Sequence, residues 1–179
     1  TFRPSQGFGL GGHVSLTLPA PTDVLAAGRT QTLDTLTWSV PGGSTVRLQQ
    51  LLGELGYLPL DWHPAKGEVP ATTIGQAEAA IHPPGGTFTW RYANTPNELE
   101  ALWKTSEPNV ITRGAVMMFE HEHGLAVDGI AGPRVWRMVL ADAVAGKRYT
   151  AGYSYVYVHR AVPQRLTLWH AGTIVLTSP

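Results

Sequence analysis

Residues 112–140 read TRGAVMMFEHEHGLAVDGIAGPRVWRMVL, which predicts two amphipathic helices joined by a glycine-rich turn. The first helix is expected over about 112–123, with Gly124 placed to end it. The second begins at Pro133, a residue that suits the first position of a helix. The apolar positions of the two helices are Ala115, Val116 and Phe119, and then Val135, Trp136, Val139 and Leu140. Both helices therefore carry one face that must be buried.

Three further helices are predicted upstream of this pair. Ser44 is a plausible N-cap for a helix that runs to Leu55, with leucines at helical spacing. A second helix is expected over about 73–81. A third is expected to start at a capping box formed by Thr95, Pro96 and Glu98, and to continue through Leu99, Leu102 and Trp103.

Alternating apolar and polar residues predict strands at both ends of the chain. Residues 14–18 and 36–40 alternate near the N-terminus, where Pro19 and Pro21 are expected to end the first strand. This part is interpreted as the tail of an immunoglobulin-like domain, or as a small sheet packed on the helices after it. Residues 153–176 contain further alternating runs around a turn at His170-Ala171-Gly172, as in a β-hairpin. The predicted fold class is α+β, a small helical bundle with an inserted helical segment, flanked by N-terminal and C-terminal β-strands.

Three pieces of the sequence, taken in order, resemble the three-helix peptidoglycan-binding domain that is appended to many wall hydrolases and transpeptidases. They are residues 46–57 (VRLQQLLGELGY), residues 114–125, and the Asp-Gly-Ile-Ala-Gly turn with its following helix in 127–140. The resemblance covers about 44–143. It departs from the family at about 61–110, where this chain has an insertion in place of a short turn.

The C-terminal strands resemble the first strands of an L,D-transpeptidase (YkuD-like) catalytic domain, on residues 155–158 and 164–169. That resemblance implies a larger parent enzyme that cross-links wall peptides through a cysteine nucleophile. These 179 residues contain no cysteine, so catalysis by this chain alone is not expected, and the chain is interpreted as a truncated or processed piece. The expected domains are 1–43 (β-strand segment), 44–143 (helical domain) and 144–179 (linker and first strands of the incomplete domain).

The charge balance bears on the partners of the protein. Lys plus Arg and Asp plus Glu are equal at 13 each, so no long-range field attracts nucleic acid, and a nucleic-acid partner is not expected. No apolar run approaches the roughly 20 residues that span a bilayer, so no membrane span is expected. The resemblance implies an extracellular, cell-wall-associated location in a bacterium. The implied partners are peptidoglycan glycan or stem peptide, and a catalytic domain tethered in the parent chain.

Two groups of residues are candidates for ligand binding. Asp128 and Gly129 form a tight turn whose backbone amides could line a groove for wall polymer, although a purely structural turn is the commoner use of this pattern. Trp90 and Tyr92 could stack on sugar rings, and Arg91 between them could meet a stem-peptide carboxylate. Aromatic residues more often fill a core, so that alternative stays open.

The sequence also leaves two other functional classes open. A metal-dependent wall hydrolase would need clustered ligands, but His121 and His123 do not share a helix face. No metal ligand, no cofactor and no catalytic residue is therefore assigned. A structural spacer that binds nothing is the second alternative.

Overall fold

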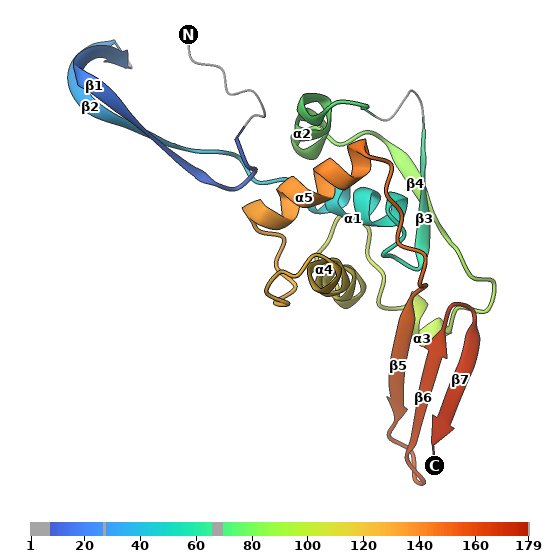
Figure 1. Ribbon diagram of the computed structural model, residues 1–179. Helices are drawn as coiled ribbons and strands as arrows, with labels where there is room; N and C mark the ends of the chain where they lie inside the picture. The colour runs from blue at the N-terminus through green and yellow to red at the C-terminus, as the bar shows by residue number, and fades with distance from the viewer. Residues whose placement is uncertain (1–7, 27, 66–69, 179) are drawn as a thin grey trace.

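The computed structural model describes residues 8–26, 28–65 and 70–178. A group of helices forms the centre of the molecule, a long two-stranded ribbon projects from one side, and a three-stranded sheet extends from another (Figure 1). The elements in chain order are β1 (His13–Ala26), β2 (Arg29–Ser39), α1 (Thr45–Glu54), β3 (Leu60–Pro64), α2 (Thr73–Ile81), β4 (Gly86–Trp90), α3 (Asn97–Glu100), α4 (Val110–Glu122), α5 (Pro133–Val144), β5 (Ser154–His159), β6 (Arg165–His170) and β7 (Thr173–Ser178). This arrangement confirms the predicted α+β class with strands at both ends. None of the described helices is long and apolar enough to cross a membrane.

The central core is built around α1. Its leucines pack with the apolar faces of α4 and α5 in one buried cluster, which includes Leu51, Leu52, Phe119, Trp136 and Val139. The two sequence segments 46–57 and 114–140 therefore share a core, as their resemblance to pieces of one three-helix domain implies. The same cluster also contains Leu10 and Trp169, which come from the flanking β segments.

The ends of α1 follow the predicted signals. The Ser44 hydroxyl accepts a hydrogen bond from the Arg47 backbone N–H at 3.3 Å, which caps the first turn. At the other end Gly56 has a φ of +88°, and the Tyr57 N–H donates to the Leu52 carbonyl at 2.9 Å. This turn sends the chain directly into β3.

Buried polar residues of α1 hold the inserted segment in place. The Gln49 side-chain amide donates to the backbone oxygens of Lys104 and Glu107 at 3.0 and 3.1 Å. Arg47, whose side chain is fully buried, donates to the side-chain oxygens of Gln50 and Gln76, each at 2.9 Å. The insertion is thus anchored on α1 by hydrogen bonds of buried polar side chains.

Within the insertion, β3 pairs antiparallel with β4, and α2 has the predicted bounds. The capping box predicted at Thr95 is wrong. The Thr95 hydroxyl donates to the Tyr92 carbonyl at 2.7 Å, Pro96 is the N-cap without a side-chain hydrogen bond, and α3 ends at Glu100. The Thr95 hydroxyl is thus committed to the preceding turn, and the helix is a single short one.

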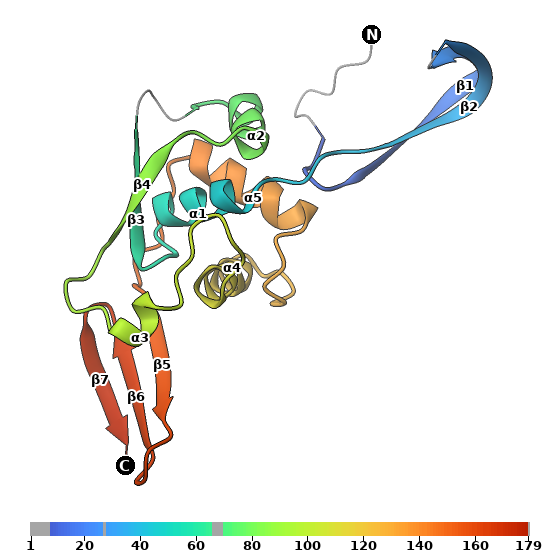
Figure 2. The same ribbon diagram turned by 180° about the vertical axis from the view of Figure 1, so that it is seen from behind.

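The N-terminal strands form an isolated ribbon (Figure 2). Strands β1 and β2 pair with each other from His13 to Ser39, and no third described strand joins them. The prediction that Pro19 and Pro21 end the first strand is wrong, because β1 continues through both with a register shift between Thr17 and Thr22. In a two-stranded ribbon each strand has a free edge, where proline removes no ladder hydrogen bond. The interpretation of residues 1–43 as the tail of an immunoglobulin-like domain stays a prediction.

The C-terminal sheet has the order β5-β6-β7 and is antiparallel throughout. The hairpin predicted around His170-Ala171-Gly172 is present, and its turn is the two residues Ala171 and Gly172, both with positive φ, because His170 already pairs with Thr173. Trp169 of β6 is 1% exposed, and its indole N–H donates to the Asn94 carbonyl at 3.0 Å. One side chain thus joins this sheet to the insertion and to the helical core.

Candidate peptidoglycan-binding site

The turn between α4 and α5 is held by hydrogen bonds within the protein. The Ile130 N–H donates to the Asp128 carboxylate at 2.8 Å, and the Gly129 N–H donates to the Glu120 carboxylate at 2.8 Å. Gly129 has a φ of +71°, and a Cβ added there would lie 2.7 Å from Cγ of Arg113. Two of the amides predicted to line a groove are therefore already bonded, which gives this turn a defined shape.

Glu120 of α4 accepts the hydrogen bond from the Gly129 N–H and so holds the turn in place. Glu120 is 1% exposed, and this burial raises the pKa of its carboxyl, whereas the hydrogen bond from Gly129 lowers that pKa. Glu120 is not among the candidate site residues named from the sequence, so this role was missed. A usable signal was present, because Glu120 lies four residues after Val116 and next to Phe119 on the buried face.

A groove of about 380 Å³ lies beside this turn. Leu48 and Val116 contribute buried apolar surface to it, and Val110, 60% exposed, lies at its edge. The Arg113 guanidinium donates to the Asp128 carbonyl at 3.3 Å and brings a positive charge to the groove. The complete lining is Thr45, Leu48, Pro108, Asn109, Val110, Thr112, Arg113, Val116, Gly129 and Ala131. The groove thus combines apolar surface with hydroxyl, amide and cationic groups.

The second group of predicted site residues lies on and after β4. Arg91 donates to the Asp61 carboxylate through Nε at 3.1 Å and Nη2 at 2.8 Å, and also to the carbonyls of Gly53 and Gly56. Tyr92 packs edge-to-face against Trp169 with ring centroids 5.3 Å apart. Trp90 is half-buried and packs against the core. In this structure Arg91 meets a carboxylate of the protein itself.

The structure does not bring the two predicted groups together. The groove beside Gly129 includes Thr45 and Leu48 from the first turn of α1, whereas Arg91 bonds to Gly53 and Gly56 at the last turn. A helix of 10 residues is roughly 15 Å long, so the two groups lie at opposite ends of α1.

The histidines of α4 do not form a metal site with their neighbours. His121 is largely exposed, and His123 Nε2 lies 2.7 Å from the Asp142 carboxylate. Among residues 8–26, 28–65 and 70–178, no three His, Asp or Glu side chains are grouped so that they could hold a metal ion. The geometry therefore gives the metal-dependent alternative no support.

Comparison with known proteins finds one segment that matches a family. Residues 107–139 match the family described as "Putative peptidoglycan binding domain". This matched segment runs from the residues before α4 into α5, and it supplies eight of the ten residues that line the groove beside Gly129. It supports a peptidoglycan-binding role and is consistent with association with the cell wall.

The remaining comparisons add no further relative. No curated protein and no solved structure matches the chain. The resemblance of 155–158 and 164–169 to an L,D-transpeptidase has no support from these comparisons. Residues 46–57 lie outside the matched segment, although they share its buried core.

Proposed function

We propose that this protein binds peptidoglycan through the groove beside Gly129. The observation that carries the proposal is the coincidence of the groove with the matched segment 107–139. Gly129 lines the groove and Asp128 does not, and the hydrogen bonds within their turn hold this side of the groove in a fixed shape before any ligand arrives. Such preorganisation reduces the ordering cost of binding.

The composition of the groove suits a wall polymer. The side chains of Thr45 and Arg113 offer hydrogen-bond donors to glycan hydroxyls, amide carbonyls or stem-peptide carboxylates. The apolar surface of Leu48 and Val116 suits the methyl groups of acetyl and alanyl substituents.

Retention on purified insoluble peptidoglycan tests the proposal. Arg113→Glu reverses the charge at the groove and is expected to reduce the retained fraction at least fivefold, since a charge-assisted hydrogen bond contributes roughly 1.5–3 kcal/mol. Arg29→Glu makes the same change at an exposed position of the β1–β2 ribbon and is the matched control. Equal retention of the two variants, or retention of the unmodified protein no better than that of an unrelated protein, would refute the groove and favour a spacer.

Substitution of an apolar groove residue by a charged one gives a second, independent test. Val110→Asp places a charge at the groove edge, and Val175→Asp does so at a similarly exposed position on β7. Loss of retention is expected for the first variant alone, because the wall polymer would have to desolvate the new carboxylate.

Trp90, Arg91 and Tyr92 are proposed as a second, separate contact with the wall polymer. Their half-buried side chains and the ion pair of Arg91 with Asp61 also suit a structural role. Arg91→Ala separates the two: reduced retention with an unchanged urea midpoint supports contact, whereas a lower midpoint with unchanged retention supports structure alone.

We further propose that the protein acts outside a bacterial cell, at the wall, as a targeting module of a larger L,D-transpeptidase. The support is the sequence resemblance of the C-terminal strands. Tethering would raise the effective concentration of the enzyme near its substrate even with weak binding. The parent reading frame tests this directly: a Ser-His-Gly-Cys type motif beyond Pro179 is expected, and a frame without one refutes the transpeptidase assignment.

A further inference from the structure

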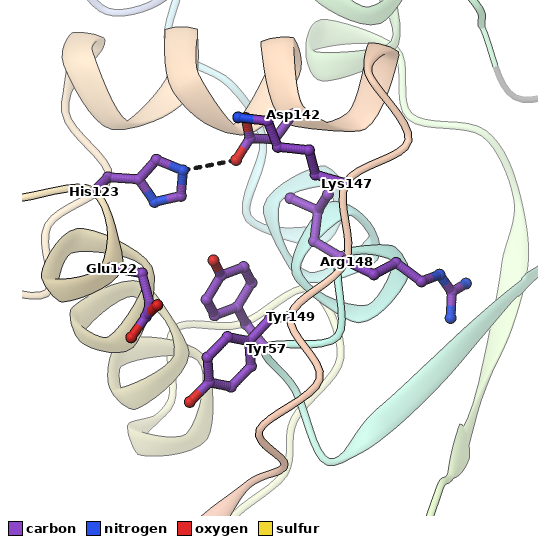
Figure 3. Close-up of a pocket in the computed structure, with 8 residues that line it drawn as sticks. Tyr57, Glu122, His123, Asp142, Lys147, Arg148 and Tyr149 are labelled. Carbon is purple, nitrogen blue, oxygen red and sulfur yellow. Dashed lines mark hydrogen bonds and ion pairs between the residues drawn. The ribbon is translucent and has the colours of Figure 1, made fainter.

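A second pocket lies at the other end of the helical core, where α1, α4 and α5 all end (Figure 3). It has a volume of about 190 Å³ and is walled by the stacked rings of Tyr57 and Tyr149, whose centroids lie 4.7 Å apart at 12°. The Tyr149 N–H donates to the Leu55 carbonyl at 2.7 Å, which fixes the segment after α5 against the end of α1. The pocket is therefore built by elements distant in sequence.

The charged side chains around this pocket differ in whether they are paired within the protein. Asp142 is bound on both sides, by His123 Nε2 at 2.7 Å and by Lys147 Nζ at 2.8 Å. The Arg148 guanidinium points away from the pocket, and its charge acts on Glu54 (Figure 3). The Glu122 carboxylate differs, since it lies 3.6 Å from the largely exposed His121 and its side chain is 43% exposed. Glu122 thus presents an accessible negative charge to the pocket.

Two tyrosines of the pocket have raised pKa values, and nearby carboxylates contribute to both shifts. The pKa of Tyr57 is raised to about 12, first by burial and then by the charges of Asp142 and Glu122. Burial raises the pKa of Tyr149 as well, again with a contribution from Glu122. Carboxylates at the C-terminal ends of helices add to the negative end of each helix dipole. Neutral tyrosine rings in such a field attract cations over their faces.

We infer that the pocket formed by Tyr57, Glu122 and Tyr149 binds a primary ammonium group at the end of a short alkyl chain. Its volume is below the 300–1,000 Å³ typical of sites that enclose drug-sized ligands, so it suits an aminoalkyl end and does not enclose a sugar ring. The ammonium would pair with Glu122 while the alkyl chain lies on the tyrosine rings. In wall polymers this chemistry occurs on a diamino acid of a stem peptide, and a free amine also occurs on glucosamine. This site goes beyond the groove beside Gly129 and does not depend on it.

The inference is tested by titrating the full chain with small probes and monitoring binding through the chemical shifts of the backbone amides in NMR spectra. The probes are Nα-acetyl-lysine amide, its uncharged isostere Nα-acetyl-norleucine amide, methyl glucosaminide, and Nα-acetyl-alanine as an anion. Shifts at His123 and Tyr149 are expected with the lysine amide and not with the isostere. A response to the glucosaminide alone, to the anion alone, or to the lysine amide and its isostere equally would overturn the inference.

Three variants make the test specific. Glu122→Gln should weaken lysine-amide binding by up to about fivefold, because it removes one partly exposed ion pair and leaves the cation–π contact with the tyrosine rings in place. Glu100→Gln, an exposed change on α3, is the matched control and should leave binding unchanged. Lys147→Gln should strengthen binding, because it frees an oxygen of Asp142 and removes a repelling charge. Weakened binding in Lys147→Gln would contradict the electrostatic reasoning, and the fold of each variant is checked in the same spectra.

The outcome is separable from that of the groove. Loss of wall retention in Arg113→Glu with intact ammonium binding would separate the two sites, whereas failure of the lysine probe leaves the peptidoglycan test unaffected.

Discussion

Replacing Glu120 by alanine should destabilise the protein by about 1–3 kcal/mol. The change removes the acceptor of the Gly129 N–H, and a partly buried donor without its partner costs about that amount. Glu120→Gln keeps an acceptor oxygen and nearly the same volume, so its stability should stay within about 1 kcal/mol of the unmodified protein. The comparison isolates the hydrogen bond from the charge.

Urea unfolding followed by tryptophan fluorescence at neutral pH measures both variants. A loss of 1 kcal/mol corresponds to a fall of about 2–4 °C in Tm for a chain of this size, which thermal scans can check. The difference in stability between the unmodified protein and Glu120→Gln should also depend on pH in a defined direction. Because the pKa of Glu120 is raised in the folded state, its ionisation costs stability, so the unmodified protein should gain relative to Glu120→Gln as pH falls toward 4.5. Equal losses in the alanine and glutamine variants would refute the hydrogen-bond reasoning, as would an alanine variant of unchanged stability.

Three other predictions concern the core and the tyrosines. Leu51→Ala, at a position with no exposed surface, should cost about 2–5 kcal/mol in the same urea assay, and a loss below that range would mean that the core closes over the cavity. Gly43→Ala should cost roughly 1–3 kcal/mol, because the added Cβ would overlap the buried indole of Trp136; unchanged stability would show that the ring can shift. Tyr57 and Tyr153 have pKa values raised to about 12, first by burial, so their contribution to stability should be constant below about pH 10 and should be lost between pH 10 and 12, as the unfolded chain ionises first. Tyrosinate absorbance of the folded protein checks this, and full ionisation by pH 10 would contradict it.

Local signals in the sequence predicted the helical core well. Ser44, Gly56, Pro133 and the leucine spacing of α1 act within one or two turns of chain, so their physics is visible without the fold. The same is true of the turn at Ala171-Gly172, where glycine permits positive φ.

Positions whose role depends on distant partners were harder to predict. Thr95 has the pattern of a cap, but its hydroxyl bonds to Tyr92, and no local rule distinguishes the two uses. Pro19 was expected to end a strand, yet the strand lies in a ribbon with two free edges, which is a property of the whole sheet. The pocket that contains Tyr149 depends on a chain segment folding back onto α1, which no spacing in the sequence predicts.

The buried indole of Trp169 has a mechanical consequence. Because Trp169 packs into the helical core, the β5–β7 sheet is expected to move together with the helices as one rigid body. Any group carried on those strands would be presented at a set distance and angle from a polymer held in the groove, unlike one on a flexible linker that samples a sphere. Under the proposed function, this rigid connection would restrict which neighbouring wall strands such a group could reach and would favour one orientation among them.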